Sequence, residues 1–326
     1  DGTPLVGTAD GKDIASGAKD TDNGKPGSEY NTADNGMKPT RITTAEGKVY
    51  ELVPASTKGD ETGTVESGQT KEVTYVYKEV KGNVVVHYTD EAGNKIAEDA
   101  KDTTDGSIST PYDTSDNGMK PERITTPEGK VYELVPASTK GAETGKVTEG
   151  TTEVTYVYKE VTGDVVVHYV DTEGNVIAED KEDTKGASLN SKYDTTDNKP
   201  EKIEKDGTVY YLTEKAVKDD SKPENGDVVE GKTEVTYVYE KAGQVVVHYT
   251  DEKGNTIQVD AVDTKDGKPN ADYNTADNGM KPNRITTPEG RVYELIPQST
   301  KGDETGKVKA GETTEVTYVY KEITGN

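Results

Sequence analysis

Three histidines are the side chains best suited to acid–base or metal chemistry in this sequence. His87, His168 and His248 occupy one position of a repeated pattern, each within an alternating apolar stretch, and none has a second histidine nearby. An imidazole can serve as a general base or a metal ligand. The chain has no cysteine and no Gly-x-Ser-x-Gly motif, so it offers no recognisable nucleophile. We therefore expect structural or surface histidines, no cofactor, no metal and no enzymatic activity.

Acidic side chains are abundant enough to raise the question of calcium. The segment Asp20 to Gly24 superficially resembles a calcium-binding loop, but a glycine takes the place of a ligand and the downstream glutamate is missing. A second pattern, Tyr-(Asn/Asp)-Thr-x-Asp-Asn, begins at Tyr30, Tyr112, Tyr193 and Tyr273. It fits a calcium or glycan contact, or a turn in which the Asx side chain caps the backbone and Tyr ties the loop to the core. We favour the turn. The candidate ligand-binding residues are Tyr112, Asp113, Asp116 and Asn117, with their equivalents Tyr193, Asp194, Asp197 and Asn198.

Composition limits what can position these residues. Among 326 residues, 63 are acidic and 39 basic, a net charge of −24 that disfavours nucleic acid and anionic membranes as partners. Only 29% are hydrophobic, with no Phe, Trp or Cys, but 20 Tyr. Val, Ile and Tyr favour strands, so we expect a mostly β protein, α+β at most, made of small units. No apolar run is long enough for a membrane-spanning helix, and the chain starts mid-motif without a signal peptide, as expected of a fragment.

The small units are visible as a repeat. Val73-Thr74-Tyr75-Val76-Tyr77 recurs from Val154, Val235 and Val316, each 81 residues after the last. We divide the chain into repeat 1 (1–82), repeat 2 (83–163), repeat 3 (164–243) and repeat 4 (244–326). Repeat 1 is expected to lack its first strand and to carry an insertion between Gly2 and Tyr30, where the stretch Gly11 to Gly27 is rich in glycine. Repeat 3 diverges from the others between residues 194 and 230.

Within repeat 2 the pattern predicts about five strands. Alternation places Val84, Val86 and Tyr88 on one face of a first strand and His87 on the other. A return strand is expected from Lys95, then a loop with at most one helical turn near Tyr112. The full prediction is strand 83–89, return strand from 95, loop 102–120, hairpin 124–126 with 131–135, and closing strand 153–159.

The joints between repeats are short. Only six residues separate Tyr77 from Val84, and five separate Tyr239 from Val245. The closing strand of one repeat should therefore run almost directly into the opening strand of the next. This predicts a stiff array of four domains forming an elongated rod.

The repeat resembles a known family. The segments Val84 to Gly93, Glu128 to Leu134 and Val154 to Tyr158, with Gly145 and Val147, together look like the MucBP (mucin-binding protein) repeat. The resemblance implies β-grasp-like domains in a wall-anchored adhesin of Gram-positive, streptococcal-type bacteria. It further implies an extracellular location, with an anchor that this sequence does not contain.

Two functions follow from this resemblance and the short joints. In the first, the repeats bind host mucin, glycans or an extracellular matrix protein, weakly for each copy and more strongly through the avidity of several copies. Alternatively, they form a passive stalk that projects a distal adhesive domain. In both cases we expect a monomer without membrane insertion. Intramolecular Lys-Asn isopeptide bonds stay open, because no spacing identifies a pair.

Overall fold

The computed structural model describes residues 1–325, which form strands and short 3-10 turns without an α-helix. Contacts divide the chain into two units, Asp1–Val161 and Thr162 onward, and each contains two of the four repeats. The expected mostly β class is therefore confirmed, as is its construction from repeats.

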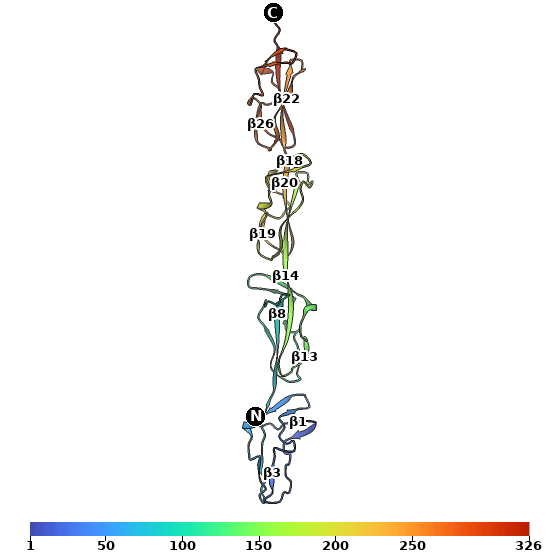
Figure 1. Ribbon diagram of the computed structural model, residues 1–326, viewed down its shortest axis with the longest axis vertical. Helices are drawn as coiled ribbons and strands as arrows, with labels where there is room; N and C mark the ends of the chain where they lie inside the picture. Colours follow the sequence, from blue (N-terminus) through green and yellow to red (C-terminus); the bar gives the residue numbers. More distant parts are fainter. Residues whose placement is uncertain (326) are drawn as a thin grey trace. The chain divides into compact units, whose positions relative to one another are not determined.

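Repeat 4 shows the complete arrangement (Figure 1). Its first strand, β21 (Gly243–Asp251), and its last, β27 (Thr313–Glu322), lie side by side and parallel. β22 (Thr256–Gly267) pairs with the outer side of β21, whereas β25 (Val292–Leu295) and then β24 (Arg284–Thr286) follow β27. This mixed sheet around a central parallel pair agrees with the expected β-grasp-like arrangement. A separate ladder joins β23 (Asp272–Asn274) to β26 (Thr305–Lys307), and η4 (Pro297–Ser299) is a single turn.

Alternation explains why these strands form. Val245, Val247 and Tyr249 point into the core with exposures of 0%, 0% and 1%, and Tyr318 and Tyr320 are fully buried beside them. The tyrosine rings are the largest buried side chains of this core, which contains no Phe or Trp. The hydroxyl groups are satisfied at its edge, since Tyr320 donates to the carbonyl of Pro282 over 2.9 Å.

Repeat 2 has the same sheet, and most of the predicted strands are confirmed. β8 (Lys81–Asp90) buries Val84, Val86 and Tyr88, and β14 (Gly150–Asp171) runs parallel to it. The predicted hairpin is β11 (Arg123–Thr125) with β12 (Val131–Leu134). The remaining elements are β9 (Ala100–Ser107), β10 (Pro111–Asp113), η2 (Pro136–Ser138) and β13 (Thr144–Lys146).

Two local predictions were wrong in this repeat. The return strand β9 starts at Ala100, because Lys95 makes only an isolated bridge to Thr89. The predicted loop at 102–120 contains the rest of β9 and all of β10, whose polar residues pair at sheet edges where their side chains meet solvent. The 3-10 turn of this repeat, η2, begins with Pro136, whose ring presets the backbone, and the residues around Tyr112 form no helical turn.

Repeat 3 opens with the second half of β14, which pairs in parallel with β20 (Gly231–Lys241) from Gly163 to Asp171. One continuous strand thus supplies the closing strand of repeat 2 and the opening strand of repeat 3. β18 (Thr208–Val217) is longer than its counterparts and pairs with β17 (Lys202–Lys205). The other elements are β15 (Lys181–Ser188), β16 (Lys192–Asp194), η3 (Thr196–Asn198) and β19 (Asn225–Asp227).

Repeat 1 is organised differently on one side of its sheet. β1 (Val6–Ala9) and β2 (Lys12–Ala15) form a hairpin that joins the sheet beside β4 (Arg41–Thr43), so the order is β2-β1-β4-β5-β7. β7 (Tyr77–Glu79) has no parallel partner, and the residues before it form only one bridge, at Thr74. The remaining elements are β3 (Glu29–Asn31), β5 (Val49–Leu52), η1 (Pro54–Ser56) and β6 (Thr62–Thr64).

Neighbouring repeats within each unit also contact each other through side chains. In the first unit, the Arg41 guanidinium donates two hydrogen bonds of 2.9 Å to the carboxylate of Glu149. In the second unit, one residue separates β20 from β21, and the Tyr211 hydroxyl donates to the carbonyl of Asp266 over 2.9 Å. Repeats within a unit are therefore joined by a short peptide and by side-chain contacts.

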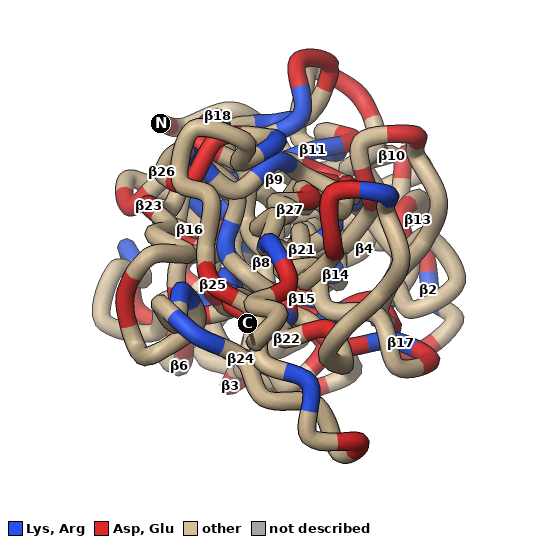
Figure 2. Tube along the Cα trace, turned by 90° about the horizontal axis from the view of Figure 1, so that it is seen from above, with Lys and Arg blue, Asp and Glu red and all other residues tan. Residues whose placement is uncertain are grey.

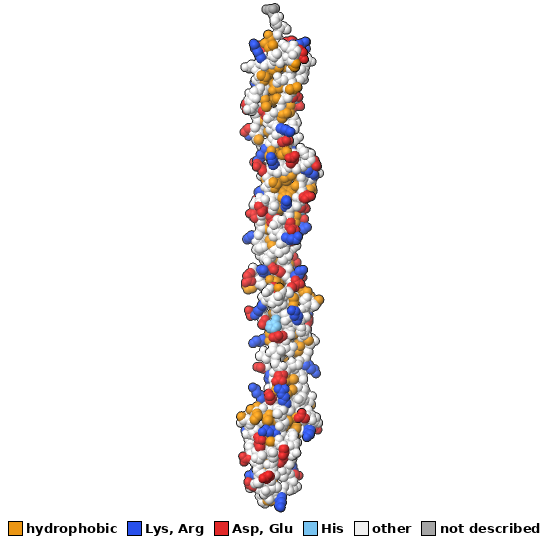
Figure 3. Space-filling model, in the orientation of Figure 1, with side chains coloured by type: hydrophobic (Ala, Val, Ile, Leu, Met, Phe, Trp, Pro, Cys, Tyr) orange, Lys and Arg blue, Asp and Glu red, His pale blue; other side chains and the backbone are white. Residues whose placement is uncertain are grey.

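The surface carries both signs of charge. Acidic and basic residues are interspersed along the backbone (Figure 2), and they are also mixed on the face seen in Figure 3. Apolar side chains appear on that face only in small patches. Over residues 1–325 we find no helix with the length and apolar character needed to cross a membrane.

Candidate functional site

The recurring Tyr-Asx-Thr pattern is positioned by the small ladder beside the main sheet. Tyr112 lies on β10, is 9% exposed, and donates its hydroxyl to the carbonyl of Ala142 over 3.0 Å. Thr114 is fully buried, and its Oγ1 lies 2.8 Å from the hydroxyl of Tyr156 and 3.2 Å from the carbonyl of Glu143. Tyr193 and Thr195 make the equivalent contacts in repeat 3. The aromatic and hydroxyl members of the pattern thus belong to the core.

The Asx residue that follows the tyrosine closes a turn. Asp113 Oδ1 accepts hydrogen bonds from the backbone N–H of Ser115 over 2.9 Å and from its hydroxyl. These bonds, led by that from the side chain, lower the pKa of Asp113. Asp194 accepts the same backbone bond from Thr196, at 3.0 Å, and its pKa is lowered in the same way. This geometry is an Asx turn.

A lysine and a glutamate complete the cluster, and the sequence reasoning missed both. Lys120 Nζ lies 2.8 and 2.9 Å from the two carboxylate oxygens of Glu143 and 5.4 Å from the centre of the Tyr156 ring. The glutamate raises the pKa of Lys120. The signal was present, because a lysine precedes the proline at this point in every repeat. The equivalent pairs are Lys38 with Glu61, Lys199 with Glu224, and Lys281 with Glu304.

The three histidines lie on the outer face of the opening strand in repeats 2, 3 and 4. His168 Nδ1 is 2.7 Å from Asp180, and its Nε2 is 3.5 Å from Glu234. His87 and His248 have the same two kinds of carboxylate neighbour. Because the carboxylates contact opposite ring nitrogens, they cannot converge on one metal ion with the imidazole. The described residues, 1–325, contain no cluster of three or more potential metal ligands.

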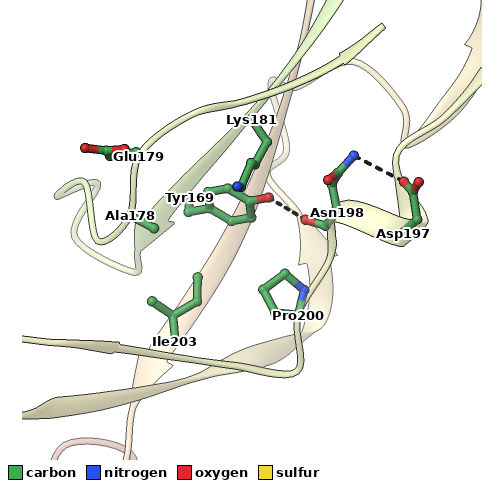
Figure 4. A pocket seen from close by; sticks show the side chains of 8 residues that line it. All are labelled: Tyr169, Ala178, Glu179, Lys181, Asp197, Asn198, Pro200 and Ile203. Carbon is green, nitrogen blue, oxygen red and sulfur yellow. Dashed lines mark hydrogen bonds between the residues drawn. The ribbon is translucent and has the colours of Figure 1, made fainter.

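The Asp-Asn pair at the end of the pattern has different surroundings in repeats 2 and 3. Asp116 and Asn117 lie on an exposed turn, where Asp116 accepts a 2.6 Å hydrogen bond from the Asn117 amide. Their equivalents, Asp197 and Asn198, line a pocket of about 410 Å³ (Figure 4). The structure therefore places two of the eight candidate residues at an open surface pocket.

Comparison with known proteins identifies the repeat. The model of the MucBP domain matches residues 6–78, 83–159, 164–240 and 244–321. The muramidase-released protein of Streptococcus suis is 42% identical over 259 residues, which cover 71% of this chain and 20% of that protein. Internalin J of Listeria monocytogenes serovar 1/2a is 28% identical over 252 residues, covering 74% of this chain and 24% of that protein. The chain thus spans about a fifth to a quarter of these relatives.

Among solved structures, the Bacillus anthracis TIE protein is similar over 98% of this chain and 67% of its own, at 10% identity and a TM-score of 0.25. Streptococcal SHIRT domains 3-4 from a cell surface protein match half of this chain at a TM-score of 0.20 and 8% identity, with all of that structure covered. The four domain matches and the 42% identical relative are consistent with each other. The chain belongs to the MucBP domain family.

Proposed function

We propose that these four repeats are a non-enzymatic spacer within an extracellular, wall-anchored surface protein of a Gram-positive bacterium. The observation that carries the proposal is strand continuity. Within the first unit β7 and β8 are separated by Val80 alone, and within the second unit β20 and β21 are separated by Ala242 alone. A peptide already committed to strands on both sides leaves little freedom for bending at a joint. The repeats are thereby suited to holding a distal domain at a set distance as a monomeric stalk.

The test uses the absence of cysteine in this chain, which permits two spin labels at introduced cysteines. Lys232→Cys and Lys321→Cys place exposed labels in repeats 3 and 4. Pulsed dipolar spectroscopy should give a narrow distance distribution. Insertion of eight Gly and Ser residues between Ala242 and Gly243 should broaden it. An equally broad distribution without the insertion would contradict the spacer proposal.

Direct binding is the second candidate, supported by the family match and by the pocket in repeat 3. In this proposal the repeats contact host mucin, another glycoprotein or a matrix protein, and gain strength through copy number. Binding of the whole chain to immobilised mucin and fibronectin would be compared with binding of residues 162–326. Absence of binding at high micromolar concentration on every surface would remove this candidate. A steep gain with the number of repeats would support it.

A further inference from the structure

Repeat 3 lacks one side chain that helps fill the core of its neighbours. Met119 in repeat 2 and Met280 in repeat 4 pack against the buried Tyr and Val cluster of their repeat. In repeat 3, Asn198 is followed directly by Lys199, so the Gly-Met pair is missing. The core cluster of repeat 3 accordingly contains no methionine. Removing a side chain of this size leaves a cavity unless the surroundings collapse.

The shortened loop keeps the same two attachments, with Asn198 taking the place of Met119 before the lysine, and these attachments oppose that collapse. Tyr169 donates to the carbonyl of Asn198 over 2.5 Å, just as Tyr88 donates to the carbonyl of Met119 over 2.7 Å. On the other side, Lys199 Nζ reaches Glu224 Oε2 at 2.8 Å, as its counterparts reach theirs. The shortened loop is therefore fastened at the same two points as the full-length loop.

A second change falls at the same place. Repeats 2 and 4 have Ala100 and Ala261 packed against the core, whereas repeat 3 has an exposed lysine, Lys181, at the equivalent position. One apolar wall of the space is thus replaced by a long side chain that ends in a cation. Two independent sequence differences, one deletion and one substitution, act on the same small region.

The resulting pocket combines an apolar interior with a polar rim (Figure 4). Tyr169, Ala178, Pro200 and Ile203 contribute the apolar surface. Around them stand two carboxylates, one ammonium and one amide, from Glu179, Asp197, Lys181 and Asn198. The rim therefore offers hydrogen-bond acceptors and donors together, with a formal charge of −1 from two acidic groups and one basic group.

We propose that this pocket of repeat 3 binds a single neutral pyranose residue of a glycan. A pyranose has an apolar C–H face that suits the Pro200 and Ile203 side, and hydroxyl groups that both donate to carboxylates and accept from an ammonium. The net negative rim disfavours sialylated or sulfated sugars. The proposal goes beyond the spacer role and, resting on the direct-binding candidate, assigns that binding to one repeat.

Saturation-transfer NMR on the whole chain tests this, because the method detects millimolar binding of small ligands. The probes are the methyl pyranosides of galactose, glucose, mannose and N-acetylgalactosamine, with N-acetylneuraminic acid and methylammonium as charged alternatives. We expect transfer to the ring C–H protons of at least one neutral sugar. Lys181→Ala should weaken its binding by about tenfold, the effect of losing one charged hydrogen bond.

Two further variants guard against misreading a folding defect. Inserting Gly-Met after Asn198 together with Lys181→Ala restores the repeat 2 pattern, and should abolish the signal while circular dichroism stays unchanged. Deleting Gly118 and Met119 together with Ala100→Lys should create a second site in repeat 2 and double the binding capacity. The proposal would be overturned if the variant with the Gly-Met insertion and Lys181→Ala still showed saturation transfer to a sugar. It would also be overturned if transfer occurred only to a charged probe. If the variant with the Gly-Met insertion and Lys181→Ala still binds immobilised mucin as before, the direct-binding proposal is retained and the assignment of binding to this pocket is wrong.

Discussion

The hydroxyl of Thr114 offers the sharpest test of whether the recurring Tyr-Asx-Thr pattern is structural. Thr114 is completely buried, and its Oγ1 lies 2.8 Å from the Tyr156 hydroxyl. Thr114→Val keeps the volume of the side chain, so no cavity forms. It leaves the buried Tyr156 hydroxyl without this partner, which costs about 2 kcal/mol of unfolding free energy, within the range for an unpaired buried polar group.

A double-mutant cycle separates this pairing from other effects. In Tyr156→Phe, Thr114 Oγ1 retains its contact with the carbonyl of Glu143, so the loss should be only about 1 kcal/mol. Thr114→Val combined with Tyr156→Phe removes both hydroxyls. The double variant should therefore lose less than the sum of the single variants, by about 1 kcal/mol.

Hydrogen exchange read by mass spectrometry supplies the assay, since it resolves individual repeats within the whole chain. Protection of amides in residues 150–158 should fall by about thirtyfold in Thr114→Val, the equivalent of 2 kcal/mol. Thr275→Val, the matched change in repeat 4, should act on β27 and leave residues 150–158 unaffected. Unchanged protection in Thr114→Val would refute the assignment of this threonine to the core network.

Three other predictions concern pH, charge and backbone geometry. Burial raises the pKa of Tyr237 to about 12, against about 10 in an unfolded chain. Because the unfolded state releases the proton first, the unfolding free energy should fall as pH rises from about 10 to 12. Tyrosinate absorbance and circular dichroism would measure this change. Lys120→Met should lower the unfolding free energy by at most about 1 kcal/mol, because the pair with Glu143 is partly exposed, and high salt should shrink the difference seen in thermal unfolding. Gly141 has φ +83°, and a Cβ there would lie 2.4 Å from a carbonyl oxygen, whereas Gly150 has φ +87° and no neighbour within 4 Å of such a Cβ. Gly141→Ala should therefore lower the melting temperature more than Gly150→Ala. Equal shifts in melting temperature would contradict the clash.

The main sheet was predictable because its signal is strong alternation. Val84, Val86 and Tyr88 lie on the inner face as expected, and the closing strand buries Val154 and Tyr156. The segments predicted wrongly are those whose extended form depends on pairing with another strand. β9 is rich in Asp and Thr and β10 has only three residues, so the sequence favours a loop there, and only pairing with neighbouring strands makes both segments extended.

The candidate site shows a similar division. The tyrosine and Asx members could be located from the repeat, and their role in a turn was the favoured interpretation. The ion pair between Lys120 and Glu143 joins residues 23 positions apart, a separation that no local pattern encodes. The pocket could not be foreseen, because a missing Gly-Met pair leaves space only when the shortened loop stays attached at the same points, as the contacts of Asn198 and Lys199 show.

The parallel pairing of the first and last strand has a mechanical consequence for a tandem array. When a chain is pulled, tension enters a repeat at the start of its first strand and leaves at the end of its last. In repeat 4 these strands are β21 and β27, which are in register from Gln244 opposite Thr313 to Asp251 opposite Tyr320. Pulled from opposite ends, parallel strands must slide along each other, so all their cross-strand hydrogen bonds carry the load at once. Each complete repeat is thereby loaded in shear, the direction in which a small β domain resists mechanical unfolding most strongly.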